Sequence, residues 1–403
     1  MARGNGADNN GADKGAPEQA RRVTILGSTG SVGVSTIDLI AREPERFSVV
    51  ALTANRNVNL LIEQARKLRP QIAAIGDESL FERLRDGLQD TKIEIAAGAD
   101  AIADAAAEPA DWVMAGIVGA AGLRPTLAAI KTGTIVALAN KECLVCAGSV
   151  VMAEAERSGC RLLPVDSEHN AIFQVFETEN VDAIERLILT ASGGPFRTKS
   201  LKEMADMSPE EAVAHPNWDM GAKISVDSAT MMNKGLELVE ASYLFPVPEA
   251  AIEILVHPQS IIHSMVGYKD GSVLAQLGSP DMRTPIAHTL AWPHRMAAPV
   301  ERLDLAKFGS LTFENPDFVR FPALRLAREA LRDGQGATTV LNAANEVAVG
   351  LFLKKRIKFL DIASIVEDAL ARISDRIDDD LDAVIALDRQ TREVAESLAI
   401  SRG

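Results

Sequence analysis

The chain has 403 residues, of which 47% are hydrophobic, enough to bury the cores of two or three globular domains. Its formal net charge of −14 argues against non-specific binding to nucleic acid, so a phosphate-bearing ligand must be small and held by local positive groups. Three cysteines, no apolar run of membrane-spanning length and no signal-peptide core predict a cytoplasmic protein that binds neither nucleic acid nor membrane.

Residues 1–20 are dominated by Gly, Ala, Asn and Asp, so they cannot bury enough apolar surface to offset the entropy of ordering. We expect a disordered tail. Cys143 and Cys146 form a CxxC pair inside the apolar run ECLVCAGSVVMA, without a second pair of ligands. Core packing therefore explains them better than metal binding or redox chemistry.

At Val23 an apolar strand begins, followed by a glycine-rich turn and an amphipathic helix. The glycines of this turn are spaced GxxGxxG, at Gly27, Gly30 and Gly33, with hydroxyl residues between them. A further strand at 47–52 completes a βαβ unit, which favours a dinucleotide site over a merely tight strand-to-helix turn.

The end of the strand at 47–52 indicates which dinucleotide binds. An NAD site usually places a carboxylate there for the ribose hydroxyl, whereas this chain reads Thr53-Ala54-Asn55-Arg56-Asn57. A guanidinium without a carboxylate favours NADP.

Additional strands are expected at 72–75, 112–115 and 134–138, with helices between them. The last strand leads into Asn140, Lys141 and Glu142. Polar residues beyond the carboxyl end of a parallel strand lie where open α/β sheets bind ligands, although a helix-capping turn is the simpler alternative.

Asp166 and Glu168 follow a short strand at 162–165. In an extended segment they would point to the same side, where at about 4 Å they would repel by about 4 kcal/mol at an effective dielectric constant of about 20. A divalent cation would offset this repulsion, and a solvated cap would screen it.

A strand at 184–190 leads to Ser192 and two glycines that allow close approach to a ligand or simply form a turn. Strand-like runs then alternate from 251 to 277, with a hairpin turn expected at 269–271, and the resulting sheet is suited to self-association. His257 and His263, which flank one run, are interpreted as structural or interfacial residues.

The segment 215–240 holds the densest chemistry. His215 and Trp218 lie in a turn-rich stretch suited to a flap over a site. A helix is expected to begin near Ser228, and its apolar stripe would be Met232, Leu236, Val239 and Tyr243. The opposite face would carry Asn233, Lys234, Glu237 and Glu240, which suits phosphate recognition or an ordinary solvated surface.

Four prolines between 292 and 322 predict a linker, and helices are expected at 324–331, 338–353, 361–373 and 391–398. The predicted fold is therefore α/β, with a Rossmann-like NADPH-binding domain at 21–165, a catalytic and dimerisation domain of mixed α+β structure at 166–291, and a helical bundle at 323–403.

Seven motifs occur in one order: GSTGSVG, ANKE, PVDSEHNA, ASGGPFR, HPNWDMGAKISVDSATMMNKGLE, HPQSIIHSMV and LNAANEVAV. Together they resemble the 1-deoxy-D-xylulose-5-phosphate reductoisomerase family from Val23 to the C-terminus. The resemblance implies a homodimeric enzyme that uses NADPH and Mg²⁺, Mn²⁺ or Co²⁺. It also implies rearrangement and reduction of the deoxyxylulose phosphate to 2-C-methyl-D-erythritol 4-phosphate, in the non-mevalonate isoprenoid pathway.

The resemblance also implies roles for individual residues. The implied metal ligands are Asp166, Glu168 and Glu237. The implied substrate contacts are Lys141, Ser167, Glu168, Ser192, His215, Ser228, Asn233, Lys234 and Glu237, of which Lys141, Glu168, His215 and Lys234 would be catalytic. The implied cofactor contacts are Thr29, Gly30, Ser31, Val32, Asn55, Arg56, Asn57, Asn140, Glu142 and Gly221.

Two features depart from the family pattern: Asn55 stands where glycine is frequent, and the N-terminal tail has no counterpart. Two other functions remain compatible with the residues. A different NADP-dependent dehydrogenase would leave the three carboxylates without a role and would keep its activity in EDTA. A non-catalytic NADP-binding regulator would consume no NADPH with any sugar phosphate.

Overall fold

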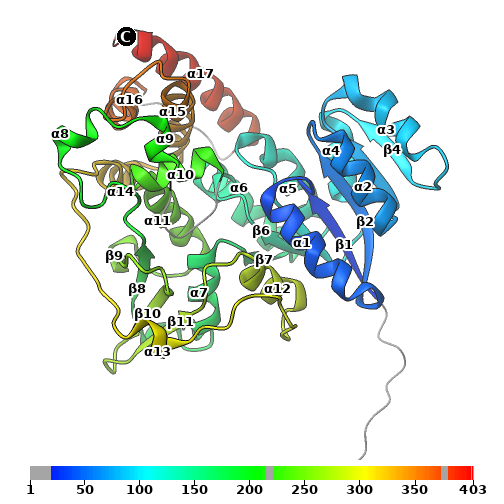
Figure 1. Cartoon of the computed structure of the whole chain (residues 1–403), viewed down its shortest axis with the longest axis horizontal. Helices are drawn as coiled ribbons and strands as arrows, with labels where there is room; N and C mark the ends of the chain where they lie inside the picture. Colours follow the sequence, from blue (N-terminus) through cyan, green and yellow to red (C-terminus); the bar gives the residue numbers. More distant parts are fainter. Residues whose placement is uncertain (1–19, 215–220, 374–379, 401, 403) are drawn as a thin grey trace, which may run out of the picture.

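The computed structural model describes residues 20–214, 221–373, 380–400 and 402. Its first half is built on a seven-stranded parallel sheet of order β4-β3-β2-β1-β5-β6-β7 (Figure 1). The strands are β1 Arg21–Leu26, β2 Phe47–Ala54, β3 Ile72–Ile75, β4 Glu94–Ala97, β5 Trp112–Ala115, β6 Ile135–Leu138 and β7 Arg161–Pro164. This confirms the predicted Rossmann-like sheet, to which the structure adds β4.

Helices cover both faces of this sheet, as short near-continuous apolar strands require. One face carries α1 Ser31–Arg42, α2 Val58–Leu68, α3 Phe81–Leu88 and α12 Arg283–Ala291. The other carries α4 Ala99–Ala107, α5 Leu123–Lys131 and α6 Glu142–Ser158. Helix α12 therefore returns to the first sheet from a distant part of the chain, and Ile286 and Leu290 enter its core.

The strand order changes direction at β1, because the chain builds outward to β4 and then places β5 on the other side of β1. Ligands of open α/β sheets bind at this switch point, beyond the carboxyl ends of the strands. The glycine-rich turn lies here. A Cβ on Gly27 would lie 2.8 Å from Gly116 O, and one on Gly33 would lie 2.3 Å from Gly27 O, so the turn can pack this closely only with glycine at both positions.

A second sheet, of order β11-β10-β8-β9, contains β8 Ile184–Ala191, β9 Ile252–Val256, β10 Ile262–Tyr268 and β11 Val273–Leu277. Only the β8/β9 pair is parallel. The predicted hairpin is confirmed, because β10 and β11 pair antiparallel on either side of the turn at 269–271. Helix α7, Ser167–Val175, packs on β10 and β11.

The described residues between 201 and 244 contain four helices: α8 Leu201–Met204, α9 Pro209–Ala212, α10 Ala222–Ala229 and α11 Met232–Leu244. The prediction of one helix beginning near Ser228 is wrong. Met231 adopts a left-handed conformation, with φ of 63°, and separates α10 from α11, so Ser228 lies in the last turn of α10. His215 and Trp218 lie outside the described residues.

The C-terminal helices are α14 Ala323–Asp333, α15 Gln335–Leu353, α16 Asp361–Arg372 and α17 Leu381–Ile400. They confirm the predicted bundle, with the last helix beginning ten residues before its expected start. Their buried side chains form one continuous core with α11 and the second sheet. The C-terminal bundle therefore packs directly against the elements that carry the site.

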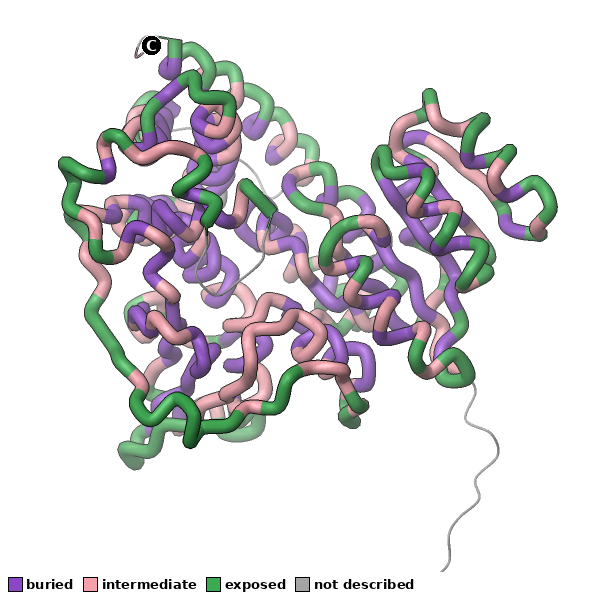
Figure 2. The backbone as a smooth tube through the Cα atoms, in the orientation of Figure 1, coloured by how far each residue is buried: buried purple, intermediate pink, exposed green. Residues whose placement is uncertain are grey.

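The yellow segment before α14 runs along the outside of the molecule and contains α13, Leu305–Phe308 (Figure 1). Most of it is exposed (Figure 2), and a β-bridge between Glu314 and Val256 links it to β9, at the edge of the second sheet. Among the described helices none is long and apolar enough to span a membrane.

Candidate active site

A cavity of about 760 Å³ opens between the glycine-rich turn, the start of α7, and helices α10 and α11. Twelve residues predicted to bind ligands line it: Ser31, Val32, Lys141, Asp166, Ser167, Glu168, Ser192, Gly221, Ser228, Asn233, Lys234 and Glu237. The fold thus brings predicted cofactor, substrate and metal residues from six segments to one space.

Asp166 and Glu168 enter the cavity from the first turn of α7. The expectation of an extended segment is wrong here, because Asp166 is the N-cap of α7 and its Oδ1 accepts a hydrogen bond from Glu168 N at 3.2 Å. The two carboxylates nevertheless face the same cavity. Ser167, between them, donates its hydroxyl proton to Glu168.

Two lysines bridge these carboxylates to α11. Lys141, the N-cap residue of α6, donates from Nζ to Asp166 Oδ2 at 2.8 Å, to Asn233 Oδ1 at 2.8 Å and to Glu237 Oε1 at 3.2 Å. Lys234 donates to Glu168 Oε1 at 2.9 Å and also contacts Glu237. The interpretation of α11 as a solvated face is therefore wrong: Lys234 is 4% exposed and Glu237 is 1% exposed.

The pKa values follow from this mixture of burial and opposite charge. Burial alone would lower the pKa of Lys141, but Asp166 and Glu237 raise it well above its ordinary value. Burial, together with the neighbouring carboxylates Asp166 and Glu168, raises the pKa of Glu237. A carboxylate that is hard to ionise beside other carboxylates indicates a local shortage of positive charge.

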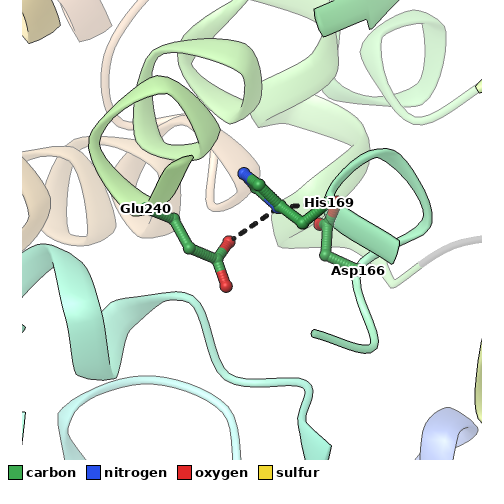
Figure 3. Close-up of side chains that lie close together, drawn as sticks. All are labelled: Asp166, His169 and Glu240. Atoms are coloured by element: carbon green, nitrogen blue, oxygen red, sulfur yellow. Dashed lines mark ion pairs between the residues drawn. The ribbon is translucent and has the colours of Figure 1, made fainter. Parts of the chain in front are cut away.

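A second cluster, which the sequence did not reveal, brings His169 and Glu240 close to Asp166 (Figure 3). His169 Nδ1 lies 3.2 Å from Asp166 Oδ1 and 3.2 Å from Glu240 Oε2, and its Nε2 lies 2.8 Å from the carbonyl oxygen of Glu237. Burial would lower the pKa of His169, but Glu240 and Asp166 outweigh it and raise the pKa to about 9. A helical interpretation of 167–175 would have found this pair, because His169 lies three residues after Asp166.

The carboxylates fit a divalent metal ion. One oxygen each from Asp166, Glu168 and Glu237 lie within 4.8 Å of one another, and all three residues line the cavity. Mg²⁺ and Mn²⁺ prefer such oxygen donors. A set with His169 and Glu240 is equally compact, but neither residue lines the cavity and the raised pKa of His169 favours imidazolium, which cannot bind a metal.

Ser192, in the loop after β8, and Ser228, in α10, line the same cavity as Lys234 and add hydroxyl groups to its wall. Gly194 permits this approach: its φ is +68°, and a Cβ there would lie 2.4 Å from Ser228 O. Two hydroxyls beside an amide and an ammonium group suit an anionic oxygen ligand.

The adenosine side of the predicted cofactor site is open. Asn55, Arg56 and Asn57 are exposed beyond β2, and Arg56 Nε lies 3.4 Å from Asp77 Oδ2. Asn57 caps α2 by accepting a hydrogen bond from Leu60 N at 3.3 Å. Thr29 and Gly30 belong to the glycine-rich turn before α1 but do not line the cavity.

Asn140 and Glu142 lie behind the cavity wall. Asn140 is 1% exposed, and its side-chain amide donates to Gly119 O at 3.0 Å and to Ile117 O. Glu142 is 5% exposed and accepts a hydrogen bond from Lys223 Nζ at 3.2 Å. Their role as cofactor contacts stays a prediction.

Other lining residues gave no signal in the sequence. Asp281 and Met282, just before α12, and Arg283, its first residue, line the cavity together with Asp38 of α1. Arg283 pairs with Asp281 at 2.6 Å and with Asp38 at 3.4 Å. This wall depends on α12 packing beside α1, which local sequence patterns do not record.

His257 precedes β10, His263 is the second residue of β10, and neither is among the residues that line this cavity. His257 Nδ1 lies 2.9 Å from Thr312 O, and Ile261 N donates to its Nε2 at 3.2 Å. Burial lowers the pKa of His263 to about 4, which keeps its ring neutral.

Three family models match the chain. They describe 1-deoxy-D-xylulose 5-phosphate reductoisomerase at residues 23–148, its C-terminal domain at 162–245, and the DXP reductoisomerase C-terminal domain at 277–394. Curated relatives carry the same name. The protein of Rhodospirillum centenum is 61% identical over 384 residues, covering 95% of this chain and 96% of that protein. The protein of Zymomonas mobilis is 57% identical over 380 residues, covering 94% and 98%.

Solved structures agree with this similarity. The Zymomonas mobilis reductoisomerase in complex with NADPH has a TM-score of 0.90 at 55% identity, covering 95% of this chain and 99% of that one. A DOX-P reductoisomerase in complex with NADPH, fosmidomycin and magnesium has a TM-score of 0.91 at 43% identity, covering 94% and 98%.

Proposed function

The chain belongs to the 1-deoxy-D-xylulose 5-phosphate reductoisomerase family, and from that premise we propose how its cavity performs the family's reaction. The enzyme uses NADPH and a divalent metal ion to rearrange and reduce 1-deoxy-D-xylulose 5-phosphate to 2-C-methyl-D-erythritol 4-phosphate in the non-mevalonate isoprenoid pathway. The observation that carries the proposal is the convergence of Asp166, Glu168 and Glu237 with Lys141 and Lys234 in one cavity that extends to the glycine-rich turn.

Asp166, Glu168 and Glu237 would hold the metal ion. When bound, the ion polarises the carbonyl and adjacent hydroxyl oxygens of the substrate and so makes rearrangement of its carbon skeleton easier. Lys141 and Lys234, each with Nζ among these carboxylates, act as donors to substrate oxygens that gain negative charge.

The substrate phosphate is assigned to the corner formed by Ser192, Ser228, Asn233 and Lys234. Supporting this assignment, all four line the same cavity as the carboxylates, and Lys234 supplies a positive charge. Ser167 lines the metal side and is proposed to contact the substrate there. His215, also proposed as a substrate contact and catalytic residue, lies outside the described residues.

The cofactor is assigned to the switch point of the first sheet. Its pyrophosphate would lie at Thr29–Val32, where the amino end of α1 favours an anion, and Arg56 would contact the 2′-phosphate. Asn55 and Asn57 flank Arg56, and Gly221 lines the cavity at the start of α10. NADPH supplies the hydride that reduces the rearranged aldehyde, and a proton completes the alcohol.

We also propose a homodimer and the domain limits 21–165, 166–291, 292–322 and 323–403. Strand β11 lies at an edge of the second sheet, and its Val273 and Leu274 are 46% and 43% exposed. An exposed apolar edge strand is a ready surface for pairing with a second copy. Within these limits the second domain contributes α12 to the core of the first sheet, because Ile286 and Leu290 pack there.

The assay that tests this function follows NADPH absorbance with 1-deoxy-D-xylulose 5-phosphate and Mn²⁺. NADPH should be oxidised only with both present, and EDTA should stop the reaction until metal is restored. Activity that persists in EDTA would favour a metal-independent dehydrogenase. No NADPH oxidation under any of these conditions would favour a non-catalytic NADP-binding protein.

A further inference from the structure

One face of helix α10 lines the cavity, and a second face contacts α6 of the first domain and α15 of the C-terminal bundle. Gly221, Ile224 and Ser228, spaced by three and four residues, line the cavity. Lys223 and Asp227, at i and i+4, lie on a neighbouring face and pair with each other at 2.9 Å. The orientation of Ser228 therefore depends on what holds this second face.

Helices α6 and α15 hold this second face of α10. Lys223 Nζ donates to Glu142 Oε1 at 3.2 Å, at the first residue of α6, immediately after Lys141. Asn345, in the middle of α15, donates from Nδ2 to Asp227 Oδ1 at 2.7 Å. The series of contacts from Glu142 through Lys223 and Asp227 to Asn345 thus connects the first sheet's domain, α10 and the C-terminal bundle.

This network is buried, and its members depend on one another. Asp227 is 1% exposed and Asn345 is fully buried. Burial alone would raise the pKa of Glu142, but Lys223 outweighs it and the pKa is lowered. Removing one member leaves a buried charge or amide without its partner, which a helix only eight residues long can relieve by moving.

We infer that Lys223, Asp227 and Asn345 are positioning residues that fix the cavity-facing side of α10, so that the C-terminal bundle contributes to phosphate binding through Ser228. This inference rests on the proposed function, because it assigns the phosphate to the corner that contains Ser228. It gives the LNAANEVAV motif, which contains Asn345, a function beyond packing.

Asn345→Ala tests the inference, with Asn342→Ala as the matched control. Asn342 is also fully buried, lies one turn earlier in α15 and donates to Glu346 Oε1 at 3.3 Å rather than to α10. Both variants should lower Tm to a similar extent. Asn345→Ala should raise KM for the substrate by about fivefold or more with little change in kcat or in NADPH affinity, as expected when one hydrogen bond that positions a binding group is lost. Asn342→Ala should leave substrate KM within about twofold of wild type.

Lys223 provides an independent test that does not depend on the folding of the Asn345 variant. Lys223→Met should raise substrate KM, and Lys223→Arg, which keeps a donor between the two carboxylates, should restore it. Titration calorimetry with inorganic phosphate, which involves no turnover, should show weaker phosphate binding by Lys223→Met than by the wild type or Lys223→Arg.

Equal substrate KM shifts in both asparagine variants, or wild-type KM in Lys223→Met, would overturn the positioning role. A wild-type chain that does not oxidise NADPH with the substrate would instead contradict the proposed function.

Discussion

Four carboxylates surround the site, from Asp166, Glu168, Glu237 and Glu240, and face three cationic groups, from Lys141, Lys234 and His169. Counted with all four carboxylates ionised and His169 protonated, the cluster carries a net charge of −1, which opposes binding of a phosphate dianion. A divalent cation reverses the sign of this balance. Metal binding should therefore favour substrate binding as well as chemistry.

Glu237→Gln keeps the side-chain shape and removes one charge from the metal site. Losing even an outer partner of a metal ligand typically costs about 10- to 100-fold in affinity or activity, so this ligand should cost at least as much. Mn²⁺ titration and steady-state turnover measure both effects, while NADPH fluorescence should be unchanged. Glu367→Gln, in an exposed pair with Arg325, is the control. Wild-type metal affinity in Glu237→Gln would remove this residue from the metal site.

Arg56→Ala tests the choice of cofactor. The guanidinium is 81% exposed and lies beside Asp77, so it is accessible to a 2′-phosphate. Losing one charge-assisted contact should weaken NADPH binding by about 10- to 150-fold, equivalent to about 1.5–3 kcal/mol, and should affect NADH far less. Arg66→Ala, which removes another surface arginine paired with Asp90, should change neither affinity. Equal losses for both cofactors would contradict the assignment.

The cysteines should be unreactive in the folded chain. Burial raises the pKa of Cys143 to about 12 and that of Cys160 to about 11, and it raises the pKa of Cys146 well above its ordinary value. The thiolate is the reactive form, and at pH 8, well below these pKa values, only a trace of each cysteine is a thiolate. Modification by a thiol reagent should therefore be slow. Mass spectrometry should find Cys160 labelled first and all three only after unfolding. Rapid labelling of native Cys143 would mean that solvent and reagent reach its thiol, which contradicts the burial that raises its pKa.

At the scale of elements, α11 joins the site to the core. Its polar residues Asn233, Lys234 and Glu237 line the cavity, and its Leu236 and Val239 are fully buried in the core shared with the C-terminal bundle. The break at Met231 allows α10 and α11 to present Ser228 and Asn233 to one space. A single straight helix from Ser228 would place these two residues five positions apart, on different faces.

Leu236→Ala should therefore destabilise the protein through the core rather than through the chemistry. A large-to-small change at a fully buried leucine costs about 2–5 kcal/mol of unfolding free energy, which denaturant titration measures. Below the unfolding transition, substrate KM should change less than in Asn345→Ala, because no polar contact is removed. A loss of unfolding free energy below about 0.5 kcal/mol would show that the surrounding core repacks to fill the space left by the leucine side chain.

At the scale of the whole molecule, the segment before α14 passes along the outside of the fold and β11 forms an edge of the second sheet. Leu305 and Phe308 of the outer segment are 55% and 43% exposed, and Leu311 packs on the patch formed by Ile262 and Met265 of β10 with Ala275 and Leu277 of β11. Exposed apolar side chains near an edge strand favour the proposed dimer interface on this side of the molecule.

Val273→Asp should weaken that dimer, because it introduces a charge into an apolar edge strand. Sedimentation should give about twice the chain mass for wild type and a concentration-dependent shift toward the monomer for the variant. Ile400→Asp, at a 74% exposed position near the end of α17, should leave the mass unchanged. An unaffected dimer in Val273→Asp would place the interface elsewhere.

The sequence by itself determined the local chemistry and most elements. Apolar patterns predicted the strands and the C-terminal helices, because burial repeats every two residues in strands and about every 3.6 in helices. The turn residues at 269–271 predicted the hairpin. The glycine spacing predicted the strand–turn–helix at Gly27, and the motifs identified the family and twelve of the residues that line the cavity.

Only the tertiary structure decided which of these residues meet and which are buried. Asp166 and Glu237 are 71 positions apart, and their convergence with Lys141 depends on α7, α11 and α6 packing around one space. Helical periodicity could not distinguish a solvated face from the buried Lys234 and Glu237, because a cavity and bulk water both select polar side chains. The left-handed Met231 and the return of α12 to the first sheet are likewise set by long-range packing, which no local pattern records.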